Sequence, residues 1–478
     1  MSRPGVEVYS LAAAPPSGVP TDTSVAFIVA EAAQGPTDAP TRLTSLDAFD
    51  STYGSTRIPG TYGRDSVEIA FSEGVSTIYF MRAADGALAA TADAAAIAAG
   101  STVDAASPGA WADGVKLDVA GSVGAKSVTV TSAAGAVVQK SGAVLVTLGD
   151  LQGFLASGTT LVASGGDPTT PLTSGTVTLA GGDDGTLPAS DTAVITAING
   201  ISKTLGPGNL GAPGRFAVDV QTALLAAAEA TNRYAVLDTD PAADAVELLS
   251  ATLELRGLDS DRYGMLWAPW AVVSGVAPGT KRTIPWSPIQ MGACARVDKT
   301  GNPNQAAAGQ WGVSNSAIGL TQAFSDDEAE QLLYAGVDTA RTVYGAVEAY
   351  GFRSLVDPNG PRRDWLQANW GRLNMAIVAQ SERVGQSKVF AQLDGRGHTI
   401  AAYNGALAGV LLDFYNRDAL FGDTAVDAFE VNTGPQVNTI ENIADGILSA
   451  VLDVCMSPHA ELVRIYIVKS PIAVALAA

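Results

Sequence analysis

Helical and strand patterns alternate between residues 219 and 267, which read DVQTALLAAAEATNRYAVLDTDPAADAVELLSATLELRGLDSDRYGMLW. Residues 219–231 have a helical composition, and residues 242–256 carry an amphipathic helical pattern. Residues 234–237 and 263–267 are short apolar runs, which indicate buried strands. Because strand–helix–strand alternation is typical of an α/β layer, we expect a helix-covered sheet here.

The segment at residues 86–200 differs in composition from both of its flanks. It contains no arginine and no glutamate, and alternating runs of β-branched and polar residues occur at residues 126–131 and 175–179. Such alternation between glycines indicates half-buried strands. We therefore expect residues 86–200 to be an inserted, β-rich peripheral domain within an α/β domain formed by residues 21–85 and 201–325. The alternative is one domain with a polar sheet face.

The helical signals become sharper after residue 325. Ser325 and Glu328 have the spacing of a capping box, which indicates a helix start. Residues 274–325 are only weakly periodic and suggest an ordered loop, so we expect a further α/β domain at residues 326–478. Its expected elements are helices at residues 399–415 and 441–452 and strands at residues 389–391 and 462–468. The fold class predicted for the chain is mixed α/β, with several domains.

Both ends of the chain carry strand patterns. Near the start Val6, Val8 and Leu11 alternate with polar residues, and several prolines separate residues 1–20 from the rest of the chain. A strand on such an arm joins its own sheet with difficulty, but it can join the sheet of a neighbour. Residues 462–468 form the corresponding strand at the other end. We expect Val463, Ile465 and Ile467 to pack in the core of their own subunit as well.

Composition and charge exclude several classes of protein. The net charge of −20 repels phosphate backbones, so the surface as a whole is unsuited to nucleic acid. The two cysteines, Cys294 and Cys455, cannot form a disulfide framework or a four-thiolate zinc site. No stretch has the pattern of a signal peptide or a membrane span, and we expect folding in a reducing cytosol.

Motifs of catalytic or cofactor chemistry are weak. Residues 206–211, GPGNLG, match the dinucleotide fingerprint, but Pro207 removes an amide and Pro213 interrupts the helix that the fingerprint requires, which favours a surface loop. Residues 181–185, GGDDG, lack the ligand spacing of a calcium loop and suggest a tight turn. The two histidines, His398 and His459, are expected to be ordinary surface or loop histidines, and no phosphate loop or nucleophile elbow occurs. We therefore expect no catalytic, cofactor-binding or metal-binding residues.

Short motifs in a characteristic order resemble the contractile-tail sheath proteins of bacteriophages and related injection machines. The resemblance covers most of the chain outside residues 86–200, although Val75 and Pro288 stand where the family commonly has glycines. Each motif alone is weak, and the signal lies in their order. The motifs are PGV at residues 4–6, GP at 35–36, TS at 44–45, Phe49, YG at 53–54, AFSEG at 70–74, YFMR at 79–82, GDDG at 182–185, GPG at 206–208, PG at 213–214, APW at 268–270, ARVD at 295–298, Gly301, YGFRSL at 350–355, Trp370, Arg372, Leu373, DAL at 418–420 and FEV at 429–431.

The resemblance implies a structural subunit without a cofactor. Sheath subunits stack as hexameric rings in a helical sleeve around a tail tube, and the sleeve shortens and widens to drive the tube through a cell envelope. The implied partners are further copies of the chain, the tail tube protein, the baseplate and the tail terminator, with no direct contact to nucleic acid or membrane. The implied location is the virion tail, assembled in the cytoplasm of the host bacterium, in a phage or in a phage-derived injection device.

The resemblance also assigns roles to parts of the chain. In the family, terminal strands join the sheet of an adjacent subunit, which implies a linking role for Val6, Val8, Leu11, Val463, Ile465 and Ile467. Residues 326–478 would be the inner, tube-facing domain, completed by terminal strands, and residues 21–325 the outer part. Two functions from other classes remain open: a dinucleotide-binding oxidoreductase that uses residues 206–211, and a surface-array or adhesion protein that uses residues 86–200.

A local reversal of charge suggests where the tube would bind. Residues 341–417 contain eight arginines and one lysine against six acidic residues, a net charge of +3 in an acidic chain. Pairing of these cations within the subunit is the alternative. The tube-facing candidates are Arg362, Arg363, Arg372, Arg383, Lys388 and Arg396.

Overall fold

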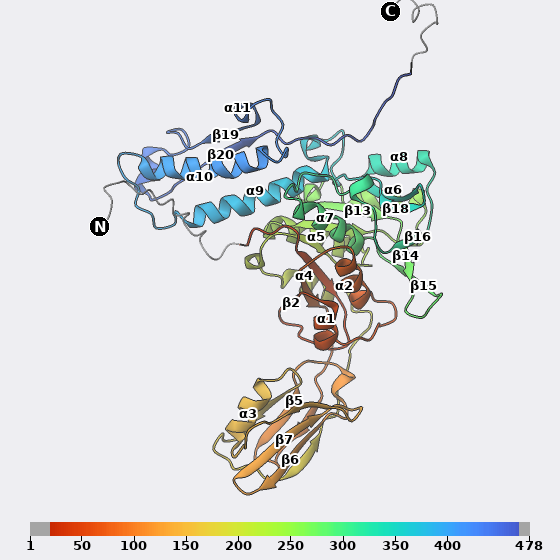
Figure 1. Cartoon of the computed structure of the whole chain (residues 1–478), viewed down its shortest axis with the longest axis vertical. Helices are drawn as coiled ribbons and strands as arrows, with labels where there is room; N and C mark the ends of the chain where they lie inside the picture. Colours follow the sequence, from red (N-terminus) through yellow and green to blue (C-terminus); the bar gives the residue numbers. More distant parts are fainter. Residues whose placement is uncertain (1–19, 468–478) are drawn as a thin grey trace, which may run out of the picture.

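The computed structural model describes residues 20–467, and its middle part is built on one large sheet (Figure 1). The eight strands of this sheet have the order β18-β17-β13-β12-β11-β1-β3-β2. The six inner strands run parallel, whereas β2 and β18 at the two edges run antiparallel to their neighbours. The strands are β1 (Ala26–Ala30), β2 (Thr41–Leu43), β3 (Ile78–Arg82), β11 (Asn209–Gly211), β12 (Tyr234–Asp238), β13 (Gly264–Ala268), β17 (Val337–Val343) and β18 (Ala346–Ala349).

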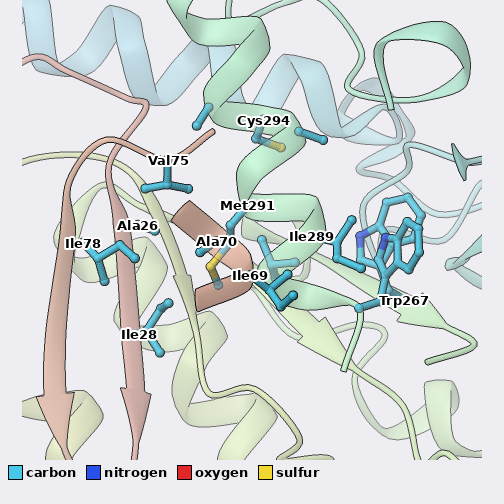
Figure 2. Close-up of a cluster of buried hydrophobic side chains, with 14 of the residues drawn as sticks. Ala26, Ile28, Ile69, Ala70, Val75, Ile78, Trp267, Ile289, Met291 and Cys294 are labelled. Atoms are coloured by element: carbon cyan, nitrogen blue, oxygen red, sulfur yellow. The ribbon is translucent and has the colours of Figure 1, made fainter. Parts of the chain in front are cut away.

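Alternate residues of the inner strands divide between two apolar cores. In β1, Ala26 and Ile28 belong to the first core, and Phe27 and Val29 belong to the second. Figure 2 shows the first core, where side chains of β1 and β3 meet those of two helices. Burial on both faces explains why the strands are continuous apolar runs, and the predicted α/β class is confirmed. The first core includes residues of α1 (Leu46–Tyr53), α2 (Gly63–Ser72) and α7 (Ser287–Lys299), and the second those of α4 (Asp191–Asn199), α5 (Val218–Thr231), α6 (Ala245–Ala251) and α8 (Asp326–Ala335).

Residues 274–325 are more regular than their weak periodicity suggested. They include most of a three-stranded sheet of β14 (Ala271–Ser274), β15 (Lys281–Ile284) and β16 (Ala317–Leu320), together with α7. Ten of the thirteen residues of α7 are buried. A helix that is buried nearly all round carries no amphipathic stripe, which is why the sequence pattern did not indicate it.

The inserted segment forms a separate lobe, which Figure 1 shows at one end of the long axis. Its apolar core draws only on residues 90–179. The composition change suggested that the insertion ends near residue 200, but the Val194 and Ile198 side chains of α4 lie in the second core of the large sheet instead. The lobe contains α3 (Leu148–Ala156), one sheet of β6 (Lys116–Ser122), β7 (Ala125–Thr131), β8 (Val137–Lys140) and β10 (Gly175–Thr178), and another of β4 (Thr91–Asp93), β5 (Ser101–Ala105) and β9 (Leu161–Gly165).

The C-terminal part packs at the other end of the long axis (Figure 1). It contains α9 (Ala368–Gln386), α10 (His398–Tyr415), α11 (Ala425–Ala428), α12 (Ile440–Ala444) and a two-stranded sheet of β19 (Phe429–Asn432) and β20 (Val451–Val454). Its core joins Leu373 and Ile377 of α9 to Leu411 and Phe414 of α10.

Three details of this region differ from the sequence prediction. The strands β17 and β18 belong to the large sheet, although the predicted boundary at residue 326 assigned them to the last domain. Residues 389–391 form part of a turn region rather than a strand, and the helix expected at residues 441–452 is limited to the short α12.

Candidate assembly surfaces

The β19–β20 sheet offers an edge to which a further strand can be added. Each of the two strands has the other as its only partner within residues 20–467. Asn404 of α10 donates a side-chain hydrogen bond of 2.8 Å to the Val431 carbonyl oxygen of β19. In β20, Val451 and Asp453 are exposed, while Leu452 and Val454 pack against the core beneath. One face of the pair is therefore supported, and β20 is its less covered strand.

The C-terminal segment at residues 462–467 is apolar but lies in solvent. Five of its six side chains are large and apolar, with exposed fractions from 69% for Leu462 to 92% for Ile467. The expectation that Val463, Ile465 and Ile467 pack in their own core is wrong for this chain, because these residues form no strand and leave the body (Figure 1). The linking residues Val6, Val8 and Leu11 lie outside the described residues.

The six basic candidates do not form one patch. Arg372 is fully buried and pairs with Asp298, with Nη2 at 2.7 Å from Oδ2, so it cannot contact a partner. Arg362 pairs with Asp259 and Asp261, at 3.0 and 2.9 Å. Arg363 is exposed before the first turn of α9, whereas Arg383, Lys388 and Arg396 lie at the opposite end of this helix. Since 19 helical residues span about 28 Å, the two groups are far apart.

Of the two groups of basic residues, the one at the end of α9 has more exposed features for a partner. It includes the connection between α9 and α10, residues 387–397, which we call the α9–α10 tip. Its Phe390 side chain is fully exposed, and its backbone has a φ of +63°, in the left-handed region that few phenylalanines adopt. Arg396 is exposed and Lys388 is half-buried. Asp394 orders the turn, because its carboxylate accepts hydrogen bonds from the backbone amides of Arg396 and His398, at 2.9 and 3.0 Å. The tip thus combines an aromatic group with two cations on an ordered loop.

The glycine motif at residues 206–211 is part of the large sheet. The fingerprint requires glycines between a strand and a helix, but here Gly206 and Gly208 precede β11 and Gly211 ends it. The motif is buried rather than the expected surface loop: a Cβ atom on Gly208 would lie 2.3 Å from the Val25 carbonyl oxygen. Close strand packing therefore explains these glycines.

The remaining motifs also have structural explanations. Residues 181–185 do not form the predicted regular turn: Asp183 pairs with Leu88 in an isolated bridge, and its side chain accepts the Gly185 amide at 2.8 Å. His459 lies in a loop, and its mostly buried side chain places Nδ1 3.0 Å from Oδ1 of Asn369. Within residues 20–467, no group of three or more His, Cys, Asp or Glu residues could hold a metal ion. None of the described helices is long and apolar enough to cross a membrane.

Comparison with solved structures identifies the fold. A crystal structure of a sheath tail protein from Listeria innocua superposes with a TM-score of 0.60 over 87% of this chain and 89% of that chain, at 14% identity. The contracted sheath complex of an extracellular contractile injection system (PVC) superposes with a TM-score of 0.58 over 98% of both chains, at 14% identity. The contracted helical sheath of the anti-feeding prophage gives 0.56 over 98% of this chain and 100% of that chain, at 15% identity.

No family model matches the sequence, and no curated protein matches it. The chain therefore shares the mixed α/β, multidomain fold of contractile sheath proteins, at 14–15% identity to the three structures above. This agrees with the resemblance that the ordered motifs suggested.

Proposed function

We propose that this chain is the sheath subunit of a contractile tail, which polymerises around a tail tube and shortens to drive the tube through a cell envelope. The observation that carries the proposal is the extent of the likeness, since nearly the whole chain superposes on nearly the whole of known sheath chains. The role is structural, with stored assembly geometry rather than catalysis as the source of work. The proposed partners are copies of the chain in hexameric rings, the tube protein, the baseplate and the tail terminator, in a tail assembled in the host cytoplasm.

Subunits are linked by strand addition at the β19–β20 sheet in this proposal. The exposed apolar residues 462–467 of one subunit supply a strand, and the open edge of β20 in the next subunit accepts it. Residues 6–11 supply the second strand. Each backbone hydrogen bond contributes only about 0.5–1.5 kcal/mol net, so a four-residue edge holds weakly by itself and strongly when it is repeated along a sleeve.

The α9–α10 tip is the proposed tube contact. Of the six basic candidates it contains Lys388 and Arg396, with Arg383 next to it in the last turn of α9, and the exposed Phe390 is its aromatic anchor. Arg372 is excluded by its burial, and Arg362 is already paired. Exposed charges contribute about 0–1 kcal/mol each and are screened beyond roughly 8–10 Å, which suits a contact that must register the sleeve and then release it.

Two measurements test the proposal. Electron microscopy of the purified protein should show hollow striated sleeves, and a planar lattice or dispersed subunits would contradict the proposal. The tube contact is tested with the pair Lys388→Glu and Arg396→Glu, assembled with purified tube at low and high salt. Sleeves should form but lose the tube, whereas the control pair Lys116→Glu and Lys140→Glu, on exposed lysines of the lobe, should retain it. Tube attachment that is unchanged in the first pair would contradict the assignment of the tip.

A further inference from the structure

Residues 457–461, just before the exposed segment, form neither helix nor strand but are held by many side chains. We call this stretch the C-terminal root. The Ser457 carbonyl oxygen accepts three hydrogen bonds, from Asn304 at 2.8 Å, Asn369 at 3.2 Å and Trp370 at 3.2 Å. A carbonyl with three side-chain donors outside secondary structure indicates a built anchoring point, since most backbone carbonyls pair within secondary structure.

The rest of the root is held as firmly. Gln367 forms two hydrogen bonds with the backbone of His459, donating to its carbonyl oxygen at 3.2 Å and accepting from its amide at 3.1 Å. The Arg353 guanidinium holds the Glu461 carboxylate through two of its nitrogens, with Nε at 3.0 Å from Oε1. From Leu462 to Ile467 the large apolar side chains are exposed, so the contacts of the C-terminal root with the body end at Glu461.

The N-terminal arm leaves the body close to α9, the helix that also contacts the C-terminal root. Thr23 and Ser24 are buried, and the Thr23 side chain reaches the Asp298 carboxylate. Pro20 packs against Gly206, because a Cβ atom on this glycine would lie 2.5 Å from the Pro20 Cβ atom. We call residues 20–24 the N-terminal root. The Asp298 carboxylate that it meets is the one that pairs with Arg372 of α9.

The start of α9 therefore connects the two roots. Asn369 donates to Oδ1 of Asn304 at 2.9 Å as well as to the Ser457 carbonyl oxygen, and it is fully buried. Arg372, one turn further on, pairs with Asp298, and its other terminal nitrogen lies 3.5 Å from the Pro303 carbonyl oxygen. Asp298 and Asn304 lie close together in sequence, Asp298 at the end of α7 and Asn304 in the loop after it.

We propose that Asn369 and Arg372 are positioning residues that fix the roots of both terminal arms to one helix. This inference rests on the proposed function, because the roots have this role only if the arms link subunits. A displacement of one arm then passes through the start of α9 to the other arm, instead of being absorbed by the β19–β20 sheet. Each subunit transmits the movement of one neighbour to the next, which is what a contraction that spreads along a sleeve requires.

Hydrogen exchange of the full-length subunit, before assembly, tests the connection. Asn369→Ala removes the bonds to Asn304, Ser457 and His459, so we expect amide exchange in residues 457–461 to rise about tenfold, with a smaller rise in residues 22–25. Trp370→Phe removes one of the three donors to Ser457 and should raise exchange in the C-terminal root less. This milder variant tests the proposal even if Asn369→Ala folds poorly.

Gln221→Ala is the matched control. Gln221 is also buried, and it donates one amide hydrogen bond, 2.7 Å long, to the Asp238 carbonyl oxygen in the large sheet. We expect this variant to lower the unfolding midpoint without raising exchange at either root. A rise confined to residues 457–461 in the Asn369 and Trp370 variants, or an equal rise in the control, would overturn the connection between the roots.

Sleeve assembly then separates the inference from the proposed function. If wild-type protein forms long sleeves and the Asn369 variant forms only short ones, the positioning role is supported. If sleeves of the variant are as long as wild type and contract as fully despite loosened roots, the positioning role is wrong although the sheath function stands. If wild-type protein forms no sleeves, the sheath function fails and the positioning role fails with it.

Discussion

Arg372 shows that the burial and pairing of a single charged residue cannot be read from its neighbours in the sequence. Counting charges in residues 341–417 placed it among cations available to a partner, but the structure buries it against Asp298, 74 positions earlier in the chain. Removing one member of such a pair costs about 3–5 kcal/mol, because the other charge remains buried. His459 is a similar case, since its contacts come from Asn369 and Gln367, about 90 residues away. The positions of partners this distant depend on the fold and not on local sequence.

Asp238, at the end of β12, makes the stability of the subunit depend on pH. Burial raises the pKa of its carboxyl group from 3.8 to about 6, against the hydrogen bonds donated by Ser287 and Gly214. The folded state therefore binds the proton more tightly, so this contribution to stability is complete below pH 3.8 and is lost as pH rises through about 6. The whole effect is of the order of 3 kcal/mol.

Asp238→Asn removes this titration. We expect the free energy of unfolding of wild type, relative to the variant, to fall as pH rises from 4 to 7, measured from urea unfolding at several pH values. Asp219→Asn, at an exposed residue in the first turn of α5, is the matched control, because it removes one carboxylate and leaves the buried site at the end of β12 unchanged. A difference between wild type and Asp238→Asn that does not vary with pH would show that Asp238 does not hold a proton in the folded state.

At the scale of elements, apolar runs predicted the strands of the large sheet better than helical periodicity predicted its helices. Residues 234–237 and 263–267 are recognisable as buried strands because helices cover both faces of the sheet to which they belong. The helix α7 was missed, since burial nearly all round removes the amphipathic pattern. The run at residues 462–468 was recognised as apolar, but periodicity indicates only that a segment will be buried, not in which molecule.

That distinction changes what truncation of the C-terminal arm should do. Because residues 462–467 are exposed in the subunit, deleting residues 462–478 should change the free energy of unfolding by less than about 0.5 kcal/mol, yet abolish long sleeves. Urea unfolding and electron microscopy provide the two measurements. Deleting residues 457–478 instead removes the C-terminal root with its bonds to Asn304 and Gln367, and should destabilise the subunit. Normal sleeves from the shorter deletion would exclude the linking role of the arm.

For the whole molecule, the sequence revealed the parts but not their limits. The lobe was visible as a change in composition, although the helix α4 after it shares that composition and packs elsewhere. The boundary at residue 326 cuts the large sheet, because parallel strands that are neighbours in space are separated by long crossovers, as β13 and β17 are. The edge of β20 that no other strand of residues 20–467 covers was not predictable, since such an edge is a property of the assembled sheet.

The lobe is joined to the body by two chain segments that pair with each other. The chain enters and leaves the lobe side by side: Leu88 and Asp183 pair through backbone hydrogen bonds of 2.8 and 3.0 Å, and the Thr186 amide donates to the Asp85 carbonyl oxygen at 2.9 Å. A short turn can therefore join Asp85 to Thr186 without disturbing either strand of the junction. The body loses two contacts with the lobe: the Pro108 carbonyl oxygen that Arg82 binds at 2.8 Å, and the Ser107 hydroxyl that accepts from the Gly35 amide at 2.9 Å. Arg82 keeps its bond to the Gly35 carbonyl oxygen.

We therefore expect replacement of residues 86–185 by a Gly-Ser-Gly turn to give soluble protein that still assembles into sleeves, because the lobe has its own core and supplies no residue to the two cores of the large sheet. The sleeves should be narrower by electron microscopy if the lobe projects outward. Deleting residues 86–200 is the matched control. It also removes α4, with Val194, Ala197 and Ile198 of the second core, and should give aggregated protein. If both deletions fail to fold, the lobe is required by the body. If the shorter deletion folds but never forms sleeves, the lobe itself carries a contact between subunits.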